Sequence, residues 1–264
     1  MIKGALHVHS TYSDGERTIA ELRALFVAEG CRFVAMADHA DAFGESSLRA
    51  YIADCERHSD ESLVFVPGLE FGCERKMHVL GYGVTKLCAT TDPQRIIEFI
   101  EQESGISVIA HPRDDAFDWI ESFDLLPMGV ETWNSKYDGR YAPRGRTFRL
   151  LRRLQLRRPE MRAFYGQDLH WRKQFHGLFT VADVKDPTAD EILAALRRGA
   201  FHGLKAELEL PSSGVLSEEV IAEFDRVNAR SSRARRFVTA LNRFRRRIGA
   251  DVPAPIKAQL RRLF

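Results

Sequence analysis

Two histidines and an aspartate stand close together near the start of the chain. If Ala5–His9 forms a strand, side-chain alternation places His7 and His9 on one face, about 7 Å apart along the strand. The pair Asp14-Gly15 predicts a turn that holds a carboxylate just beyond the strand. Two polar side chains that face water would produce the same pattern. The motif alone therefore leaves a metal site and a solvated strand both open.

The same residue types recur at or just beyond the ends of other predicted strands, as His39, Glu70, His111, Asp168 and His170. Strand ends of a parallel α/β sheet form one rim, where active sites are built. Imidazole and carboxylate ligands without thiolate suit Mn²⁺, Fe²⁺ or Zn²⁺. So many candidate ligands predict two or three ions. Adjacent divalent ions stabilise both the attacking and the leaving oxygen of a phosphoryl transfer, so phosphoester hydrolysis is the natural chemistry.

The composition is that of a soluble globular protein, with 264 residues, 44% hydrophobic and 29% charged, and a net charge of +2. The four cysteines form no C-x-x-C pair, which argues against a thiolate zinc site and favours a reducing compartment. No apolar run approaches 18 residues, so we expect no membrane-spanning helix. Because Met1–Gly4 leads directly into a strand, we expect no signal peptide and a cytoplasmic location.

Strand and helix patterns alternate along most of the chain, which predicts an α/β fold with a parallel sheet, closed or open. The expected helices are Thr18–Glu29, Glu45–His58, Asp92–Glu103, Ala116–Ser122, Gly145–Leu156 and Thr188–Arg198. The expected strands are Ala5–His9, Phe33–His39, Leu63–Phe71, Met77–Gly83, Ser107–Pro112, Met128–Trp133 and Ala163–Gly166, and Phe201–Leu210 predicts a strand pair or an edge extension.

Taken in order, these motifs closely resemble those of the PHP (polymerase and histidinol phosphatase) family. The matching segments are His7-x-His9 with Asp14-Gly15, Asp38-His39, Gly68-Leu69-Glu70, His78, Ala110-His111-Pro112 and Gly166-Gln167-Asp168-Leu169-His170. The resemblance covers about residues 1 to 205. It implies a distorted (β/α)₇ barrel, and it implies a metal-dependent phosphoesterase with a trinuclear site.

Carried over residue by residue, the resemblance implies three groups of metal ligands. His7, His9, Glu70 and Asp168 would hold the first ion, and Glu70 would bridge to a second ion held by His78 and His111. Asp14, His39 and His170 would hold the third. A plausible ligand stands at every expected position. Gln167 occupies a position where relatives commonly carry serine, a departure that removes no ligand.

The leading prediction is hydrolysis of a phosphomonoester, such as a nucleotide, a sugar phosphate or a histidinol-phosphate-like compound, by a metal-bridging hydroxide. Asp168 and His170 are candidates for proton transfer. Arg113, Lys136 and Asn134 follow predicted strand ends, where family members bind phosphate, and Arg113 is also a candidate catalytic residue. Ordinary solvated charge is an equally good account of Arg113 and Lys136. The alternatives are a phosphodiesterase or 5′-3′ exonuclease on short nucleic acids, and a module that only binds partners.

A basic extension follows the break at Pro211-Ser212-Ser213-Gly214, so we expect a phosphoesterase domain over residues 1–210 and a helical extension over 211–264. In the extension, Phe237, Leu241, Phe244 and Ile248 recur at helical spacing among arginines. Packing on the domain, contact with an anionic membrane surface and contact with a nucleic-acid backbone all stay open. A second basic run, from Arg144 to Arg158, would strengthen the case for a polyanionic partner.

Overall fold

The computed structural model describes residues 1–138 and 141–230. The predicted basic amphipathic helix, with Phe237, Leu241, Phe244 and Ile248, lies outside these residues. Within them, no helix is both long enough and apolar enough to cross a membrane.

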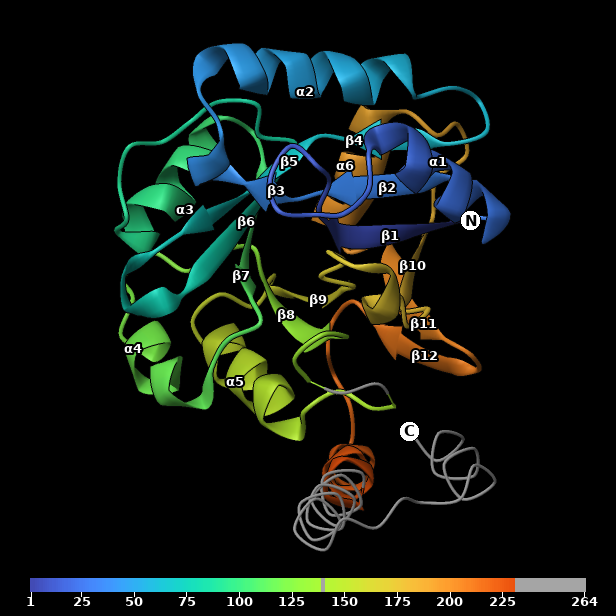
Figure 1. The fold of residues 1–264 in the computed structure, drawn as a ribbon. Coiled ribbons are helices and arrows are strands. Elements are labelled where there is room, and N and C mark those ends of the chain that lie inside the picture. The colour runs from blue at the N-terminus through green and yellow to red at the C-terminus, as the bar shows by residue number, and fades with distance from the viewer. Residues whose placement is uncertain (139–140, 231–264) are drawn as a thin grey trace, which may run out of the picture.

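The strands form two mixed six-stranded sheets with helices around them (Figure 1). In the first sheet the order is β12 (Leu208–Pro211), β11 (Phe201–Lys205), β10 (Phe179–Ala182), β1 (Ile2–Val8), β2 (Phe33–Met36) and β4 (Val64–Val66). In the second it is β3 (Asp38–His39), β5 (Gly68–Gly72), β6 (His78–Tyr82), β7 (Ile106–Ala110), β8 (Gly129–Asn134) and β9 (Arg162–Gly166).

The two sheets are joined at two places. The chain passes from β2 to β3 through Ala37 and from β4 to β5 through Pro67, which has no N–H for a ladder hydrogen bond. At the other side, Leu169 N donates to His7 O over 3.2 Å, and His9 N donates to Leu169 O over 3.0 Å. The sheets nevertheless remain separate. The described part of the chain contains no closed barrel, and the expected (β/α)₇ barrel is not confirmed.

The expectation of a parallel sheet is wrong for two parts of the chain. β5, β6 and β7 pair antiparallel, as do β1, β10, β11 and β12. Only residues 73–77 separate β5 from β6, which is too short for the crossover that parallel strands need. The reversal matters for the site, because it brings His78, at the start of β6, to the end of β5 opposite Gly72.

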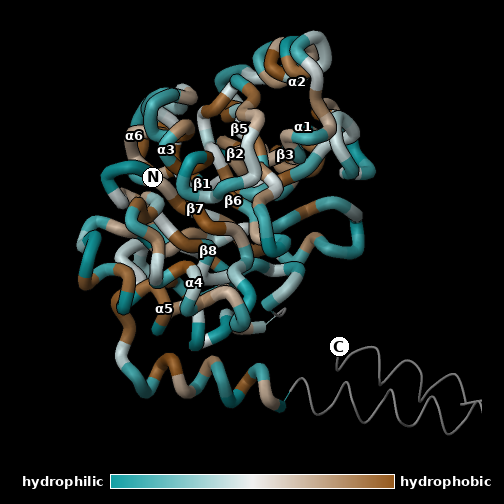
Figure 2. Tube along the Cα trace, turned by 90° about the vertical axis from the view of Figure 1, so that its left-hand side faces the viewer, coloured by the Kyte–Doolittle hydropathy of each residue, from teal (hydrophilic) through white to brown (hydrophobic). Residues whose placement is uncertain are grey.

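All the predicted helices are present, with ends shifted by a few residues: α1 (Ile19–Ala28), α2 (Glu45–Arg57), α3 (Pro93–Gln102), α4 (Phe117–Glu121), α5 (Gly145–Gln155) and α6 (Ala189–Arg198). Thr18, Asp92 and Thr188 cap α1, α3 and α6 with side-chain acceptors. Short 3₁₀ turns follow β3, β5, β7 and β9: η1 (Ala40–Ala42), η2 (Glu74–Lys76), η3 (Asp114–Ala116) and η4 (Arg172–Gln174). Apolar residues concentrate in the central strands, and hydrophilic residues in the surrounding loops (Figure 2).

The arginines of the run from Arg144 to Arg158 are paired within the chain. Residues 218–230 form a helix against α5, where Asp225 contacts Arg149 at 3.0 Å and Glu218 contacts Arg152 at 2.6 Å. Arg144, Arg146, Arg153 and Arg158 also contact carboxylates, and Arg157 donates to the carbonyls of Glu121 and Phe123. This run is therefore not an unpaired cationic stripe.

A buried carboxylate fixes the loop that follows β1. Asp38 accepts hydrogen bonds from Ser10 N at 2.8 Å, Ser10 Oγ at 2.9 Å and Ser13 Oγ at 2.6 Å. Burial raises the pKa of Asp38, so these donors must offset the desolvation of its charge. The loop they hold carries Asp14.

Replacing Asp38 by alanine should lower the free energy of unfolding by about 3 kcal/mol, because buried donors lose a charged acceptor. Asp41→Ala, an exposed change three residues away, should stay within about 0.5 kcal/mol of the wild type. Urea unfolding followed by circular dichroism measures both. Equal unfolding midpoints for the two variants would contradict a structural role for Asp38.

Candidate metal centre

The predicted ligands come together at one rim of the two sheets. They lie near the ends of β1 and β3, within β5, at the start of β6, and in the segments that follow β1, β7 and β9. Every one of them contacts at least one other through a nitrogen–oxygen pair within 4 Å: His7, His9, Asp14, His39, Glu70, His78, His111, Asp168 and His170. Segments more than 150 residues apart thus form one cluster.

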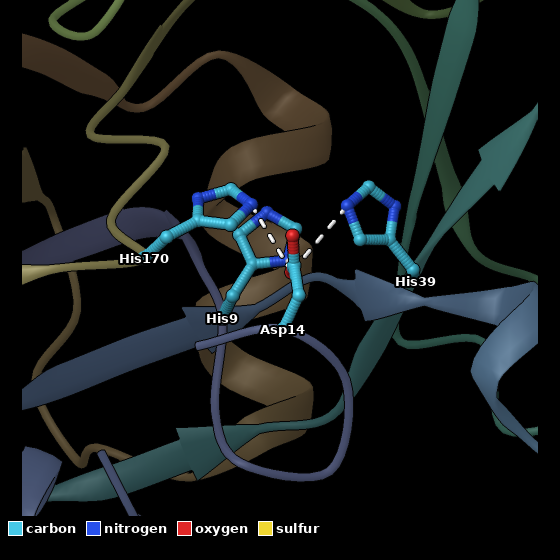
Figure 3. Close-up of side chains that lie close together, drawn as sticks. All are labelled: His9, Asp14, His39 and His170. Carbon is cyan, nitrogen blue, oxygen red and sulfur yellow. Dashed lines mark ion pairs between the residues drawn. The ribbon is translucent and has the colours of Figure 1, made fainter. Parts of the chain in front are cut away.

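One group of possible ligand atoms belongs to His9, Asp14, His39 and His170, all within 4.8 Å of one another. Figure 3 shows the Asp14 carboxylate between the rings of His39 and His170. Its Oδ1 atom lies 3.2 Å from His170 Nε2, 3.6 Å from His39 Nε2 and 3.8 Å from His9 Nδ1. The Asp14 side chain is 54% exposed, so this group lies on the solvent side of the cluster.

Two further groups lie deeper. They consist of His7, His9 and Asp168, and of His7, Glu70 and His111. Glu70 is the most connected residue of the cluster, since its carboxylate meets five imidazoles: His78 at 2.8 Å, His111 at 3.1 Å, His9 and His39 at 3.4 Å, and His7 at 3.5 Å. A carboxylate in this position can bridge two ions.

The backbone is strained at three of these residues. His7, His111 and Asp168 have φ values of 60°, 27° and 50°, in the left-handed region that non-glycine residues rarely adopt. At His7 the pairing of β1 with β2 shifts register between Leu6 and Val8. The two rings of His7 and His9 do converge, with centroids 5.1 Å apart, but through this irregularity and not through the simple alternation expected.

Charge in the cluster is set by burial and by neighbouring groups. Burial alone would raise the pKa of Glu70 and of Asp168, but the nearby imidazole of His7 helps to hold both well below their ordinary values. Burial lowers the pKa of His9 well below its ordinary value. The two carboxylates are therefore ionised and His9 is neutral, which are the forms that bind metal. Burial alone would lower the pKa of His7, but the carboxylates of Glu131, Asp168 and Glu70 raise it well above its ordinary value, so a metal that binds there would displace a proton from His7.

Whether these residues fit a metal can be tested on buried ring nitrogens that make no hydrogen bond. Among the described residues, His7 Nε2 and both ring nitrogens of His9 are buried and make no hydrogen bond. His7 Nε2 and His9 Nε2 lie 3.4 to 3.9 Å from oxygens of Glu70 and Asp168, and His9 Nδ1 lies 3.8 Å from Asp14 Oδ1. Two ligands bound to one ion at about 2.1 Å each are roughly 3 to 3.5 Å apart, so a divalent ion fits between these groups with little adjustment.

The predicted substrate-binding residues differ in their surroundings. Asn134 is buried, and its amide nitrogen donates to Glu131 at 2.8 Å and to Asp168 at 3.0 Å, while its Oδ1 accepts from two backbone N–H groups. Lys136 Nζ lies 3.0 Å from Asp168 Oδ1 and 3.4 Å from His170 Nδ1. The amide of Asn134 is thus occupied in holding Asp168, whereas Lys136 reaches the edge of the cluster.

Arg113 lies at the surface, with its side chain 59% exposed. It pairs with Asp115 through hydrogen bonds of 2.9 and 2.6 Å. Within residues 1–138 and 141–230 it forms no ion pair with a predicted ligand. Its assignment to catalysis and phosphate binding stays a prediction.

Solved structures share the arrangement of these elements. No known family and no curated protein matches the chain by sequence. A two-domain protein from Bacteroides vulgatus, which contains a predicted PHP-like metal-dependent phosphoesterase, matches 85% of this chain with 69% of its own, at 14% identity and a TM-score of 0.53. The chain has a PHP-like fold.

Two other structures match the PHP-like fold over almost their whole length. PsfC from Pseudomonas syringae covers 86% of this chain with 98% of its own, at 17% identity and a TM-score of 0.50. An amidohydrolase from Chromobacterium violaceum, with bound sulfate and no metal, covers 75% with 96% of its own, at 15% identity and a TM-score of 0.50. At these identities the likeness concerns the fold.

Within this fold, Glu131 on β8 is a site residue that the sequence interpretation missed. It is fully buried, and its carboxylate lies 2.8 Å from His7 Nδ1 and accepts from His111 N at 2.8 Å. A Cβ at Gly166 would lie 1.6 Å from Glu131 Oε1, so glycine is required there. In the sequence, Glu131 is a single acidic residue inside an otherwise apolar or neutral strand. A buried acid of this kind must have a partner, and this was the signal that could have identified it.

Replacing Glu131 by glutamine should weaken metal binding about 10- to 100-fold, because His7 loses the carboxylate that orients its ring and raises its basicity. Glu209→Gln, at a glutamate that is 71% exposed, is the matched control and should bind as the wild type does. Isothermal titration with Mn²⁺ or Zn²⁺ compares them. Wild-type affinity in Glu131→Gln would show that this carboxylate does not support a metal ligand.

Proposed function

We propose that this chain is a metal-dependent hydrolase of phosphomonoesters. One observation carries the proposal: all the predicted ligands converge at one rim of a PHP-like fold. Among the described residues, buried imidazole nitrogens of this cluster make no hydrogen bond. A module that only binds partners would not need a set of buried nitrogens aimed at carboxylates. This arrangement favours an enzyme over the binding-module alternative.

We infer three metal positions. The first lies between His7, His9, Glu70 and Asp168, and Glu70 links it to the second, at His78 and His111. The third lies at Asp14, His39 and His170, where His9 is near enough to share. Imidazole and carboxylate ligands suit Mn²⁺, Fe²⁺ or Zn²⁺.

Bound divalent ions would lower the pKa of a water molecule and polarise the phosphoryl oxygens. The chain itself would contribute positioning and charge. Lys136 lies at the edge of the cluster, where its ammonium can pair with a phosphoryl oxygen, and Asn134 holds Asp168 in place. We assign proton transfer toward the leaving group to His170, and the ionised carboxylate of Asp168, 3.1 Å from His170 Nδ1, would orient the His170 ring.

The nuclease alternative receives less support. It depended partly on the arginines between Arg144 and Arg158, and these have carboxylate and carbonyl partners inside the chain. A small phosphorylated molecule is therefore the preferred substrate. We propose no partner for residues 231–264.

The enzyme loaded with Mn²⁺ should release phosphate from a generic aryl phosphate, and excess chelator should abolish the release. Asp168→Ala should lower kcat/KM at least about 1,000-fold, since it removes a predicted metal ligand and the carboxylate next to His170. Asp118→Ala, an exposed change on α4, is the control and should retain wild-type activity. A colorimetric phosphate assay measures all of these.

A labelled oligonucleotide in the same assay separates the two enzyme classes. We expect it to stay intact while the monoester is hydrolysed. Shortening of the oligonucleotide that falls steeply as salt rises would favour the nuclease instead. A folded, metal-loaded sample that hydrolyses no phosphoester would overturn the proposed function.

A further inference from the structure

A buried ion pair lies at the base of the segment that carries Lys136. The Asp138 side chain is buried, and its Oδ1 atom accepts from Arg144 Nε at 2.5 Å. Its Oδ2 atom accepts from Asn134 N at 2.7 Å. Neither Asp138 nor Arg144 is a predicted metal ligand. Because a buried ion pair often adds little net stability, its place beside the metal centre needs another explanation.

Asp138 closes a short turn that directs Lys136 toward the cluster. Asp138 binds Asn134 in both backbone directions, since Asp138 N also donates to Asn134 O over 2.9 Å. Within the turn, Asn134 Oδ1 accepts from Lys136 N at 3.0 Å. The Lys136 ammonium then lies 3.0 Å from Asp168 Oδ1 and 3.4 Å from His170 Nδ1. A fixed backbone lowers the entropic cost of holding a long, flexible side chain at one point.

Arg144 joins this turn to the segment that follows β7. Its guanidinium also donates to Pro112 O at 3.3 Å and lies 3.7 Å from an oxygen of Asp114. Pro112 follows the predicted ligand His111 in the chain, and β7 and β8 are parallel neighbours. The ion pair therefore fixes the position of Lys136 relative to the metal centre.

From these contacts we propose that the Asp138–Arg144 ion pair is the positioning element for Lys136, and that it holds the Lys136 ammonium where a phosphoryl group would bind. Asp138 acts through Lys136 and does not touch the substrate. The role of Lys136 toward phosphate rests on the proposed phosphoesterase function, whereas its placement by the ion pair does not.

The charge on Asp138 depends on its surroundings. Burial raises the pKa of Asp138 to about 6, although Arg144 and the backbone N–H of Asn134 oppose this rise, and the Glu131 carboxylate adds to it. Asp114 is a further charged group that reaches the pair, through Arg144. As the pH falls through about 6, the Asp138 carboxyl takes up a proton and the pair loses its negative partner. The placement of Lys136 should therefore weaken below this pH.

The placement can be measured without any substrate, because Asp138→Asn removes the charge with little change in shape. In protein without added metal, reductive methylation of Lys136 is followed by peptide mass spectrometry. It should be at least about fivefold faster in Asp138→Asn than in the wild type, because the ammonium leaves Asp168 more often.

Asp60→Asn is the matched control for this labelling. The Asp60 carboxylate likewise accepts backbone N–H groups and pairs with an arginine, Arg23. Asp60 lies before the start of β4, at the opposite end of the strands from the metal centre, so its replacement should leave the methylation of Lys136 unchanged. Equal methylation rates in Asp138→Asn and in the wild type would overturn the inference.

A double-mutant cycle tests whether the ion pair acts through Lys136. In the enzyme loaded with Mn²⁺, Asp138→Asn should lower kcat/KM for an aryl phosphate about tenfold, mainly by raising KM. In a Lys136→Ala background the same change should cost less than about twofold. The Mn²⁺ affinity from isothermal titration should equal that of the wild type. A tenfold loss in both backgrounds, or a loss of Mn²⁺ affinity, would contradict action through Lys136.

Conservative variants and the pH dependence separate positioning from a general structural effect. Arg144→Lys keeps a positive charge and should retain most of the activity, whereas Arg144→Gln should behave like Asp138→Asn. The ratio of kcat/KM between the wild type and Asp138→Asn should fall from about ten at about pH 7.5 toward one below about pH 5.5, since titration of the other groups cancels in the ratio. A ratio that stays constant over this range would overturn the role of the charge.

The labelling keeps this inference separate from the proposed function. Faster methylation of Lys136 in Asp138→Asn, in a protein that hydrolyses no phosphoester, would support the positioning and overturn the proposed reaction. Hydrolysis of the aryl phosphate with equal methylation rates would overturn the positioning and leave the proposed function intact.

Discussion

The fold is organised around two ionised carboxylates, Glu70 and Asp168, that are withdrawn from water. Burying such groups without compensation is costly, and here compensation comes from imidazoles on several strands and from Lys136. The strands must therefore end where their histidines can reach these carboxylates. Metal ions would supply the remaining positive charge, which explains why some imidazole nitrogens have no hydrogen-bond partner among the residues that the structure describes.

A further layer of polar groups holds this cluster. Glu131 fixes the ring of His7 and the backbone of His111, and Asn134 connects Glu131 to Asp168. This network accounts for the left-handed backbone at His7, His111 and Asp168, since conformations of this kind persist only where many contacts determine them. Positioning of the ligands thus depends on Glu131 and Asn134, which are not among the predicted ligands.

Charged residues on α5 stabilise the packing of the domain. Arg149 and Arg152 of α5 bind the carboxylates of the helix over residues 218–230, and Asp225 also accepts from Gly145 N at the start of α5. A Cβ at position 145 would meet Asp225 and Ile221, so glycine permits this close contact. What looks in the sequence like a surface for a polyanion is in the described residues an internal contact between two helices.

The sequence by itself determined the positions of the helices and most strands, and it identified the metal-binding residue types, because these depend on local periodicity and on the chemistry of single side chains. It also indicated the PHP-like fold that the solved structures share. Strand β10 and the antiparallel pairing of β5, β6 and β7 were missed, since strand direction is decided by pairing between segments, whereas the strand pair offered for Phe201–Leu210 is present as β11 and β12. The role of Glu131, the occupied amide of Asn134 and the pairing of the arginines were likewise decided only by tertiary structure, because each depends on which distant group lies within about 3 Å, the range of a hydrogen bond.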